Sequence, residues 1–386
     1  MTQSSTLALE DGTIVQGEAF GASCDTVFEL VFNTSMTGYQ EILTDPSYRG
    51  QGVLFTASHI GNVGINLEDD ESATPQVSAA LVREISPVIS NWRAALSLSD
   101  WLAQSGVPGI SGIDTRFLTR KLRDGGTLKA ALSTRGTPPD QLLRMARDWP
   151  GLDGRDMVSE VTCAAVTPWQ GGPGDHWVAA PHLDGFPASD PLHVVLFDYG
   201  AKRNIARHLA AFGMRVTVVP AYTTCDDVLA LAPDGVLLSN GPGDPAGLPG
   251  IVNAVGELIQ RDIPIFGICL GHQLIGRAIG GETIKLKFGH HSANHPVQVL
   301  NTGKVQVTAQ NHNYAVDIAS LDPAEVEITH LSLNDHTLEG MALKHHPVFS
   351  IQYHPEAAPG PHDAHGLFEQ FYQMVLTVKA QHAKTH

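Results

Sequence analysis

The chain has 386 residues, of which 42% are apolar and 17% charged, and its formal net charge is −16. The length predicts two domains, and the apolar content supports packed cores rather than disorder. The acidic charge would repel phosphate backbones and anionic lipid, so we expect no nucleic acid or membrane partner. The longest apolar stretches are far shorter than a membrane span, and the first residues lack the pattern of a signal peptide, so we expect a soluble cytoplasmic protein.

Composition also argues against a metal or disulfide scaffold. The cysteines are widely spaced, without a CxxC pair, and are Cys24, Cys163, Cys225 and Cys269. Several histidines gather late in the chain, namely His290, His291, His295, His345, His346 and His354. These histidines lack the i, i+4 spacing or the paired cysteines of common zinc sites. We therefore expect no metal site.

The first domain is predicted to span residues 1–167 and to mix helices and strands. An Asp-Gly turn between two alternating runs at 7–20 predicts a hairpin. Further strands are expected at 27–34 and 52–57, and short helices at 99–106 and 114–124. Asp114 is the expected N-cap of the second helix. A stretch at 168–191 rich in proline and glycine predicts a linker.

The second domain, residues 192–386, is predicted to alternate strands and helices. Strands are expected at 193–200, 215–220 and 263–269, and a strand followed by a Gly/Pro turn is expected at 235–245. Helices are expected at 202–213, 251–262 and 270–280. Continuous apolar strands joined by helices predict a parallel sheet covered on both faces. Beyond residue 285 the sequence becomes richer in strand patterns.

The segment PIFGICLGHQLIG carries the strongest chemical motif. An apolar strand runs into Gly267-Ile268-Cys269-Leu270-Gly271, the thiol counterpart of the G-x-S-x-G nucleophile elbow, and a helix follows. Glycines allow the sharp turn, and a helix N-terminus favours a thiolate and a developing oxyanion. Cys269 is therefore a candidate nucleophile. The alternative is an ordinary buried cysteine at a strand end.

The segment FSIQYHPE supplies a candidate base. FSIQYH is expected to form a strand, and His354 and Glu356 stand two residues apart, so both would point to one face of an extended chain. A cysteine nucleophile needs an imidazole held in one tautomer by a third group. The alternative is a solvated pair of surface side chains.

Taken together, FGICLGHQ, YHPE and the loop LSNGPGDP at 238–245 resemble a class I, triad-type glutamine amidotransferase. Three further segments resemble the small subunit of carbamoyl-phosphate synthase: FNTSMTGYQEILTDPSYRGQ at 32–51, GHHSANHPV and QNHNYAVD. The resemblance covers nearly the whole chain. It implies an α/β protein in which a C-terminal parallel-sheet amidotransferase domain follows a mixed α/β N-terminal domain.

The resemblance also implies roles for individual residues. Cys269 matches the family's nucleophile, and His354 and Glu356 match the rest of its triad. The N–H groups of Gly241 and Leu270 match the oxyanion donors. Both residues are also counted among the glutamine contacts, together with Ser47, Gly243, Gln273, Asn311, Asn313 and Tyr314.

Two departures from the family pattern lie outside the triad. The family often has glycine where this chain has Asn313, a change that matters if the position needs a positive φ. Ser292 and Ala293 replace a usual glycine pair, which would stiffen a loop there.

The function implied by the resemblance is hydrolysis of L-glutamine and delivery of ammonia to a large synthetase subunit. That subunit would make carbamoyl phosphate from bicarbonate and ATP for arginine and pyrimidine synthesis. This chain has no G-x-x-x-x-G-K-[ST] loop, so we expect ATP and Mg²⁺ in the partner and no cofactor here. The N-terminal domain is expected to dock the partner and to form one wall of the glutamine site.

Two other functions stay open on the residues alone. One is a cysteine hydrolase that acts on a different amide. The other is a catalytically idle binding or regulatory subunit that keeps only the fold. An assay for ammonia released from glutamine separates both from an amidotransferase.

Overall fold

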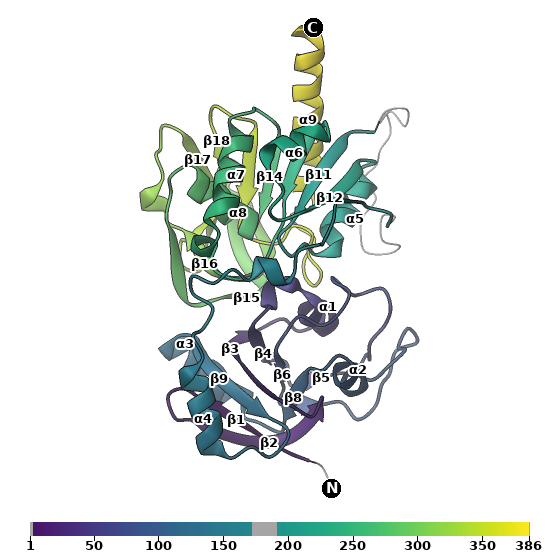
Figure 1. Ribbon diagram of the computed structural model, residues 1–386, viewed down its shortest axis with the longest axis vertical. Helices are drawn as coiled ribbons and strands as arrows, with labels where there is room; N and C mark the ends of the chain where they lie inside the picture. The colour runs from purple at the N-terminus through teal and green to yellow at the C-terminus, as the bar shows by residue number, and fades with distance from the viewer. Residues whose placement is uncertain (1–2, 172–190, 386) are drawn as a thin grey trace. The chain divides into compact units, whose positions relative to one another are not determined.

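The computed structural model describes residues 3–171 and 191–385 (Figure 1). Most of the predicted linker, residues 172–190, lies outside this described part. Contacts divide the chain into two compact units. The first holds the residues up to Asp153 together with Leu286–Asn294 and Ala358–Gly360. The second holds Gly154–Lys285, His295–Ala357 and Pro361 onward.

The first unit is built on a closed barrel of seven strands in the order β1-β2-β8-β6-β4-β3-β9. The barrel strands are β1 Ser4–Leu9, β2 Ile14–Gly21, β3 Asp25–Asn33, β4 Gln51–Phe55, β6 Ala79–Leu81, β8 Pro108–Ser111 and β9 Leu128–Ser133. A separate two-stranded sheet pairs β5 His59–Ile60 with β7 Glu84–Ile85. The helices are α1 Tyr39–Thr44, α2 Leu98–Gln104, α3 Thr115–Gly125 and α4 Pro139–Asp148, with a short 3₁₀ helix η1 at Pro46–Tyr48.

Local sequence patterns in this unit are confirmed. β1 and β2 form the predicted antiparallel hairpin, and Gly12 in its turn has φ 97°. The Asp114 carboxylate accepts from the Phe117 N–H at 2.9 Å, so Asp114 caps α3 as expected. The helices α1 and α4 and the closure of the barrel were not predicted. Closure depends on pairing between strands far apart in sequence, for which local patterns carry little information.

The second unit contains a ten-stranded sheet in the order β10-β12-β11-β13-β14-β19-β18-β17-β15-β16. Its strands are β10 Thr167–Pro168, β11 His193–Asp198, β12 Arg215–Pro220, β13 Gly235–Leu238, β14 Ile265–Ile268, β15 Thr283–Val299, β16 Val305–Val316, β17 Val326–Ser332, β18 Leu338–Leu343 and β19 Val348–Ile351. The pairs from β12 to β19 are parallel, whereas β10, β18 and β17 pair antiparallel with their neighbours. The predicted parallel sheet is therefore present, extended by the expected strand-rich region.

Helices cover both faces of the parallel part. The helices are α5 Arg203–Ala211, α6 Cys225–Ala230, α7 Pro249–Ile259, α8 Leu270–Ala278 and α9 Gly366–Thr385. One apolar core joins side chains of α6, α7 and α8 to strand residues such as Val195 and Val236. The other joins α5 and α9 to residues such as Val194 and Leu237, which point the opposite way. The α/β class and the two-domain arrangement predicted from the sequence are confirmed.

The division between the units falls before the predicted linker. Residues 154–167 belong to the second unit by their contacts, and Thr167 pairs with Val218 of β12. Among the described residues, no helix combines the length and the apolar character that crossing a membrane requires.

Candidate active site

Cys269 lies in the turn between β14 and α8, as the elbow motif predicts. Its backbone has φ 51° and ψ −102°, a strained region for a residue with a side chain. The Cys269 N–H donates to Ile351 O at 2.9 Å, and the Gly271 N–H donates to Ser239 O at 3.0 Å. A Cβ on Gly271 would lie 2.3 Å from Leu238 O, so only glycine allows this close approach. The thiol is thus held at the first turn of α8.

The loop after β13 approaches the elbow through its glycines. A Cβ on Gly241 would lie 2.3 Å from Tyr199 O and 2.7 Å from Leu270 Cδ2. Gly243 has φ 89°, where an L side chain is strained. Within the described part of the chain, neither the Gly241 N–H nor the Leu270 N–H donates a hydrogen bond. Donors of this kind can stabilise an oxyanion.

His354 and Glu356 meet as the base and its orienting group. His354 Nδ1 lies 2.6 Å from Glu356 Oε1, and both side chains are buried. Burial disfavours the imidazolium, but the Glu356 and Cys269 side chains, through charge and hydrogen bonding, outweigh it and raise the pKa of His354. His354 Nε2 is buried without a hydrogen-bond partner among the described residues. This nitrogen is therefore available for proton transfer.

The strand that carries His354 is shorter than predicted. β19 ends at Ile351, and His354 forms only an isolated bridge to Ala309. The Ala357 N–H donates to His354 O at 3.1 Å, so the chain turns at this point. The turn, rather than an extended strand, brings the Glu356 carboxylate to the imidazole.

Two residues that sequence reasoning missed hold Glu356 in place. Lys202 Nζ lies 3.1 Å from Glu356 Oε1 and also donates to Ala357 O. Asn204 Nδ2 donates to Glu356 O at 2.5 Å. Burial favours the neutral carboxyl, but Lys202 and His354 outweigh it and hold the pKa of Glu356 well below its usual range. Their position after the carboxyl end of β11, where α/β sheets place functional groups, is the pattern that could have pointed to them.

Polar side chains and carbonyls surround the thiol. Cys269 Sγ lies 3.6 Å from Asn311 O and 3.6 Å from Gln352 Nε2. The Gln273 amide, one turn past the nucleophile, donates to Tyr314 O at 2.7 Å and to Gln352 Oε1 at 3.1 Å. Four of the predicted residues thus share one buried network, to which Gln352 adds an unpredicted amide.

The departures from the family pattern fall within strands. Asn313 and Tyr314 are buried on β16, and Asn313 is not among the residues with positive φ. Asparagine therefore fits the backbone at 313 without strain. Ser292 and Ala293 lie inside β15, so the prediction of a loop at these residues is wrong. Extended backbone accepts serine and alanine as readily as glycine.

Ser47 is the one predicted site residue that belongs to the first unit. It lies buried in η1, where its N–H donates to Asp45 Oδ1 at 3.0 Å. The other predicted site residues all belong to the second unit.

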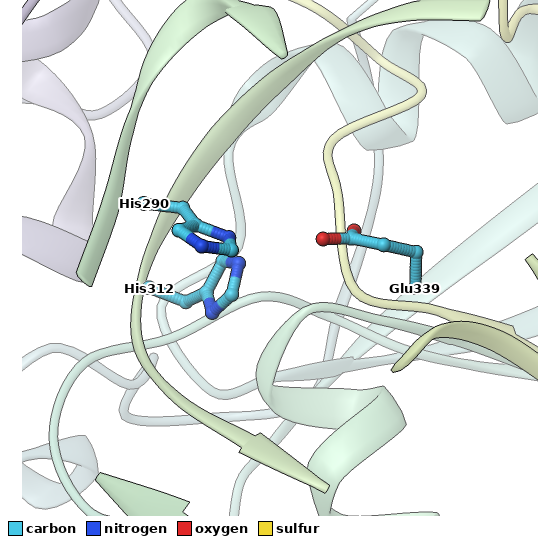
Figure 2. A group of neighbouring side chains, drawn as sticks. All are labelled: His290, His312 and Glu339. Carbon is cyan, nitrogen blue, oxygen red and sulfur yellow. The ribbon is translucent and has the colours of Figure 1, made fainter. Parts of the chain in front are cut away.

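Figure 2 shows His312 on β16 and Glu339 on β18, two buried groups of the second unit. Gln310 connects them: its Nε2 donates to Glu339 Oε2 at 2.9 Å, and its Oε1 lies 2.9 Å from His312 Nε2. Figure 2 also labels His290, which belongs to the first unit. Because the Gln310 amide bonds to both groups, we infer that His312 and Glu339 help to hold β16 and β18 together.

Comparison with known proteins supplies the family. A family model described as glutamine amidotransferase class-I matches residues 195–374. A second, described as the carbamoyl-phosphate synthase small chain, CPSase domain, matches residues 7–132.

Relatives named carbamoyl phosphate synthase small chain match almost end to end. The one from Akkermansia muciniphila is 51% identical, over 98% of this chain and 99% of the relative. The one from a Nostoc species is 50% identical, over 97% of this chain and 95% of the relative. A chloroplastic one from Oryza sativa is 48% identical, over 96% of this chain and 81% of the relative. The chain therefore belongs to the carbamoyl-phosphate synthase small-chain family and carries a class-I glutamine amidotransferase domain.

Proposed function

We propose that this chain hydrolyses L-glutamine at Cys269 and delivers the ammonia to a large carbamoyl-phosphate synthase subunit. The observation that carries the proposal is the pairing of a strained cysteine at a helix N-terminus with a buried His354–Glu356 hydrogen bond of 2.6 Å. Ser-His-Asp and Cys-His catalysis need this combination of nucleophile, base and orienting group.

In the first step the Cys269 sulfur attacks the carboxamide carbon of glutamine. The thiol proton already lies on His354 Nε2 when the sulfur attacks, in keeping with the raised pKa of His354. The Gly241 and Leu270 N–H groups stabilise the oxyanion. Each such donor is worth about 3–4 kcal/mol in comparable sites. His354 then returns the proton to the leaving nitrogen, so ammonia departs and a glutamyl thioester remains.

In the second step water attacks the thioester. His354 accepts a proton from that water, and collapse of the intermediate breaks the C–S bond, releasing glutamate and restoring the thiol. Glu356 keeps Nδ1 protonated and offsets the charge of the imidazolium. Lys202 in turn compensates the Glu356 charge in a buried position.

Substrate recognition is proposed for the polar groups around this centre. The assigned glutamine contacts are Ser47, Gly243, Gln273, Asn311, Asn313 and Tyr314. The large subunit is proposed to hold ATP and Mg²⁺ and to combine the ammonia with bicarbonate into carbamoyl phosphate for arginine and pyrimidine synthesis. Ammonia freed into water at pH 7 would be protonated and lose its nucleophilicity, so transfer within a complex is expected.

The test measures glutamate release from glutamine, with and without the large subunit, for wild type and Cys269→Ser. We expect slow glutamate release by the chain alone and faster release with the partner, ATP and bicarbonate. In Cys269→Ser the rate should fall by roughly a thousandfold or more, as is typical when a nucleophile is removed. Synthesis from added ammonia by the mutant complex should persist.

Cys225→Ser is the matched control, because Cys225 is also buried in the second unit but lies in the other apolar core. Its hydrolysis rate should stay near wild type. Equal rates for Cys269→Ser and wild type would contradict the assignment of the nucleophile. Absence of hydrolysis in wild type, with or without the partner, would favour an idle subunit.

A further inference from the structure

A cavity of about 420 Å³ lies in the first unit, between α3 and the residue that follows β4. Its volume falls in the range of small-molecule sites, roughly 300–1,000 Å³. In the described part of the chain, the residues around it are all basic or hydroxyl-bearing and are Thr56, Thr115, Arg116, Thr119, Arg120 and Arg123. A cavity lined by one sign of charge, without a carboxylate among these residues, favours an anionic occupant.

The sequence of α3 places the three arginines on one face of the helix. Arg116, Arg120 and Arg123 are spaced i, i+4 and i+7, so their guanidinium groups follow one another along the helix. Leu118 and Leu122 lie on a different face and are buried in an apolar core of the barrel. Because this packing fixes how α3 is turned, the arginine face is held toward the cavity.

Positive charge is concentrated on α3 although the chain is acidic overall. Residues 115–123 hold four of the chain's 24 basic residues and no acidic residue, whereas the whole chain has 40 acidic residues. The fourth basic residue, Lys121, lies outside the cavity lining, and its Nζ binds Asp11 Oδ2 at 2.6 Å. The three arginines are therefore the charged groups of the cavity.

Two of these arginines are free within the described part of the chain. Arg116 and Arg120 form neither a hydrogen bond nor an ion pair there. Arg123 Nη2 lies 2.9 Å from Oδ1 of its neighbour Asp124, but both side chains are more than half exposed. Exposed ion pairs of this kind are weak, so an incoming anion can compete for Arg123.

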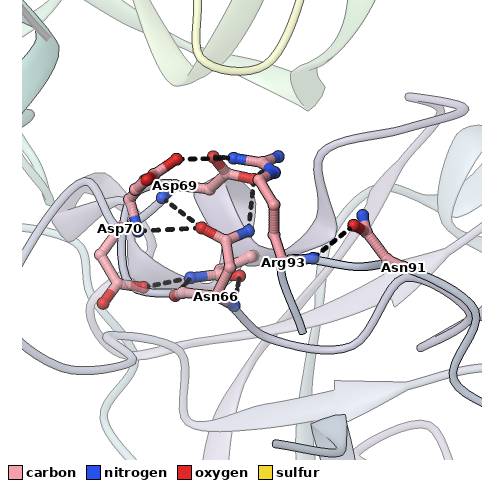
Figure 3. Close-up of polar contacts among 7 residues, drawn as sticks. Asn66, Asp69, Asp70, Asn91 and Arg93 are labelled. Atoms are coloured by element: carbon pink, nitrogen blue, oxygen red, sulfur yellow. Dashed lines mark hydrogen bonds and ion pairs between the residues drawn. The ribbon is translucent and has the colours of Figure 1, made fainter. Parts of the chain in front are cut away.

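Arg93 of the same unit shows an arginine with a structural role (Figure 3). Its Nη1 and Nη2 each lie 2.9 Å from an oxygen of Asp69, and Nη1 also binds Glu68 Oε2 at 3.1 Å. Such paired bonds hold two segments of chain in a fixed geometry. Arg116 and Arg120 make no contact of this kind among the described residues, so their charges are available to a ligand.

Threonine hydroxyls add neutral donors to the cavity. Thr119 Oγ1 donates to Thr115 O at 2.7 Å, so its proton is already used. The Thr56 and Thr115 hydroxyls form no hydrogen bond within the described residues, so each can donate to a ligand oxygen. The Thr56 N–H donates to Asn33 O at 3.0 Å, which holds Thr56 at the end of β4. Guanidinium and hydroxyl donors around one cavity suit the oxygens of phosphate groups.

We propose that this cavity, named here the Arg120 cavity, binds a small molecule that carries two phosphate groups. A phosphate group has a charge of about −1.5 to −2 at neutral pH, so three guanidinium groups balance about two of them. Arginine binds phosphate through two parallel hydrogen bonds, which a lysine cannot form. This binding is separate from glutamine hydrolysis, because all the lining residues belong to the first unit and Cys269 belongs to the second.

The test measures binding of inorganic pyrophosphate to the purified chain by titration calorimetry, at low ionic strength and without divalent metal ions. We expect saturable binding at one site, which weakens as salt is added. In Arg116→Gln and in Arg120→Gln the Kd should rise about tenfold or more, because each change removes a charged donor. Both side chains are exposed, so the melting temperature should stay at the wild-type value.

Arg144→Gln is the matched control. Arg144 is an exposed arginine on α4 of the same unit, outside the cavity lining and likewise without an ion pair among the described residues. The change removes the same charge from the chain, and the Kd for pyrophosphate should stay within about twofold of wild type.

Absence of saturable binding by wild type would overturn the proposal, as would equal Kd values for wild type, Arg116→Gln and Arg120→Gln. Sulfate and citrate test whether anionic charge alone is recognised. If either binds as tightly as pyrophosphate, the cavity holds an adventitious ion only, and the proposal fails. A nucleoside diphosphate distinguishes the sources of the phosphate groups: tighter binding than pyrophosphate would support a nucleotide, and weaker binding would support a ligand without a nucleoside.

Discussion

At the residue scale, the strained backbone of Cys269 is maintained by contacts on both sides. A φ of 51° with ψ −102° costs on the order of 1–3 kcal/mol for a residue with a side chain. The hydrogen bond to Ile351 O and the close packing of Gly271 on Leu238 hold this conformation. In this conformation the thiol lies beside Asn311 O and Gln352 Nε2, and the N–H groups of the first turn of α8 can still donate to a substrate.

Gly241→Ala should impair the proposed oxyanion donors. The new Cβ would meet Tyr199 O at 2.3 Å, a backbone atom that cannot rotate away, so the Gly241 N–H must shift. We expect kcat for glutamine hydrolysis to fall about a hundredfold, as when one donor is lost, with a smaller change in KM.

Gly250→Ala is the control for Gly241→Ala, because a Cβ at Gly250 would meet no atom within 4 Å. Its kcat and melting temperature should match wild type. A wild-type kcat for Gly241→Ala would exclude its N–H as an oxyanion donor.

At the scale of elements, α8 packs on β19 through a buried polar contact. His272 on α8 is fully buried, and its Nδ1 lies 2.9 Å from Ser350 Oγ. Burial, with a smaller effect of the charge on His330, lowers the pKa of His272 to about 3. The helix that follows the nucleophile is therefore anchored by a histidine that must stay neutral.

This histidine predicts a pH dependence of stability. Because the folded pKa is below the unfolded value of 6.5, the unfolded chain binds the extra proton, and stability falls as pH drops below about 6.5 toward 3. One such group contributes a slope of about 1.4 kcal/mol per pH unit. The free energy of unfolding, measured with denaturant at pH values between 6 and 4, should therefore change less steeply with pH in His272→Gln. The difference in this pH slope should be about 1.4 kcal/mol per pH unit, whatever the mutant's absolute stability.

His345→Gln serves as the comparison, since His345 is exposed on the same unit. It should leave the slope unchanged. If His272→Gln and wild type lose stability in parallel over this range, the buried imidazole is not the group that titrates.

At the scale of the whole molecule, the first unit is discontinuous in sequence. Residues 286–294 return to it more than 130 residues after Asp153. The Thr34 N–H donates to His291 O, and the Thr127 N–H donates to Lys287 O, both at 3.1 Å. Phe288 stacks on Phe32 with ring centroids 5.8 Å apart. The stability of this unit therefore depends on the middle of β15, a strand whose two ends belong to the second unit.

Phe288→Ala should destabilise the first unit selectively. Phe288 is partly buried, and the change removes its aromatic pair with Phe32, which is worth about 0.5–1.5 kcal/mol beyond the area it buries. Hydrogen exchange followed by mass spectrometry should show faster exchange in peptides covering β3 and β9, while β11 and β13 keep their protection.

Ile284→Ala, on the same strand but within the second unit and partly exposed, is the matched control. It should leave exchange in β3 and β9 as in wild type. Protection of β3 and β9 that survives Phe288→Ala would mean that residues 286–294 add little to the first unit.

The amino-acid sequence by itself determined the features that depend on neighbours in the chain. The Asp11–Gly12 hairpin, the Asp114 cap and the turn at Cys269 are specified within about ten residues, because turn, cap and elbow chemistry is local. The alternation of apolar strands and helices likewise predicted the covered parallel sheet.

Only the tertiary structure decided the features that join distant segments. Lys202 reaches Glu356 across more than 150 residues, and Gln352 reaches Cys269 across more than 80. Neither pairing leaves a local pattern, because a buried ion pair or amide contact depends on which strand ends meet at one edge of a sheet. The sequence also did not predict that Trp92 is 93% exposed. Tryptophan is highly buried on average, and only the fold shows which positions lie at the surface.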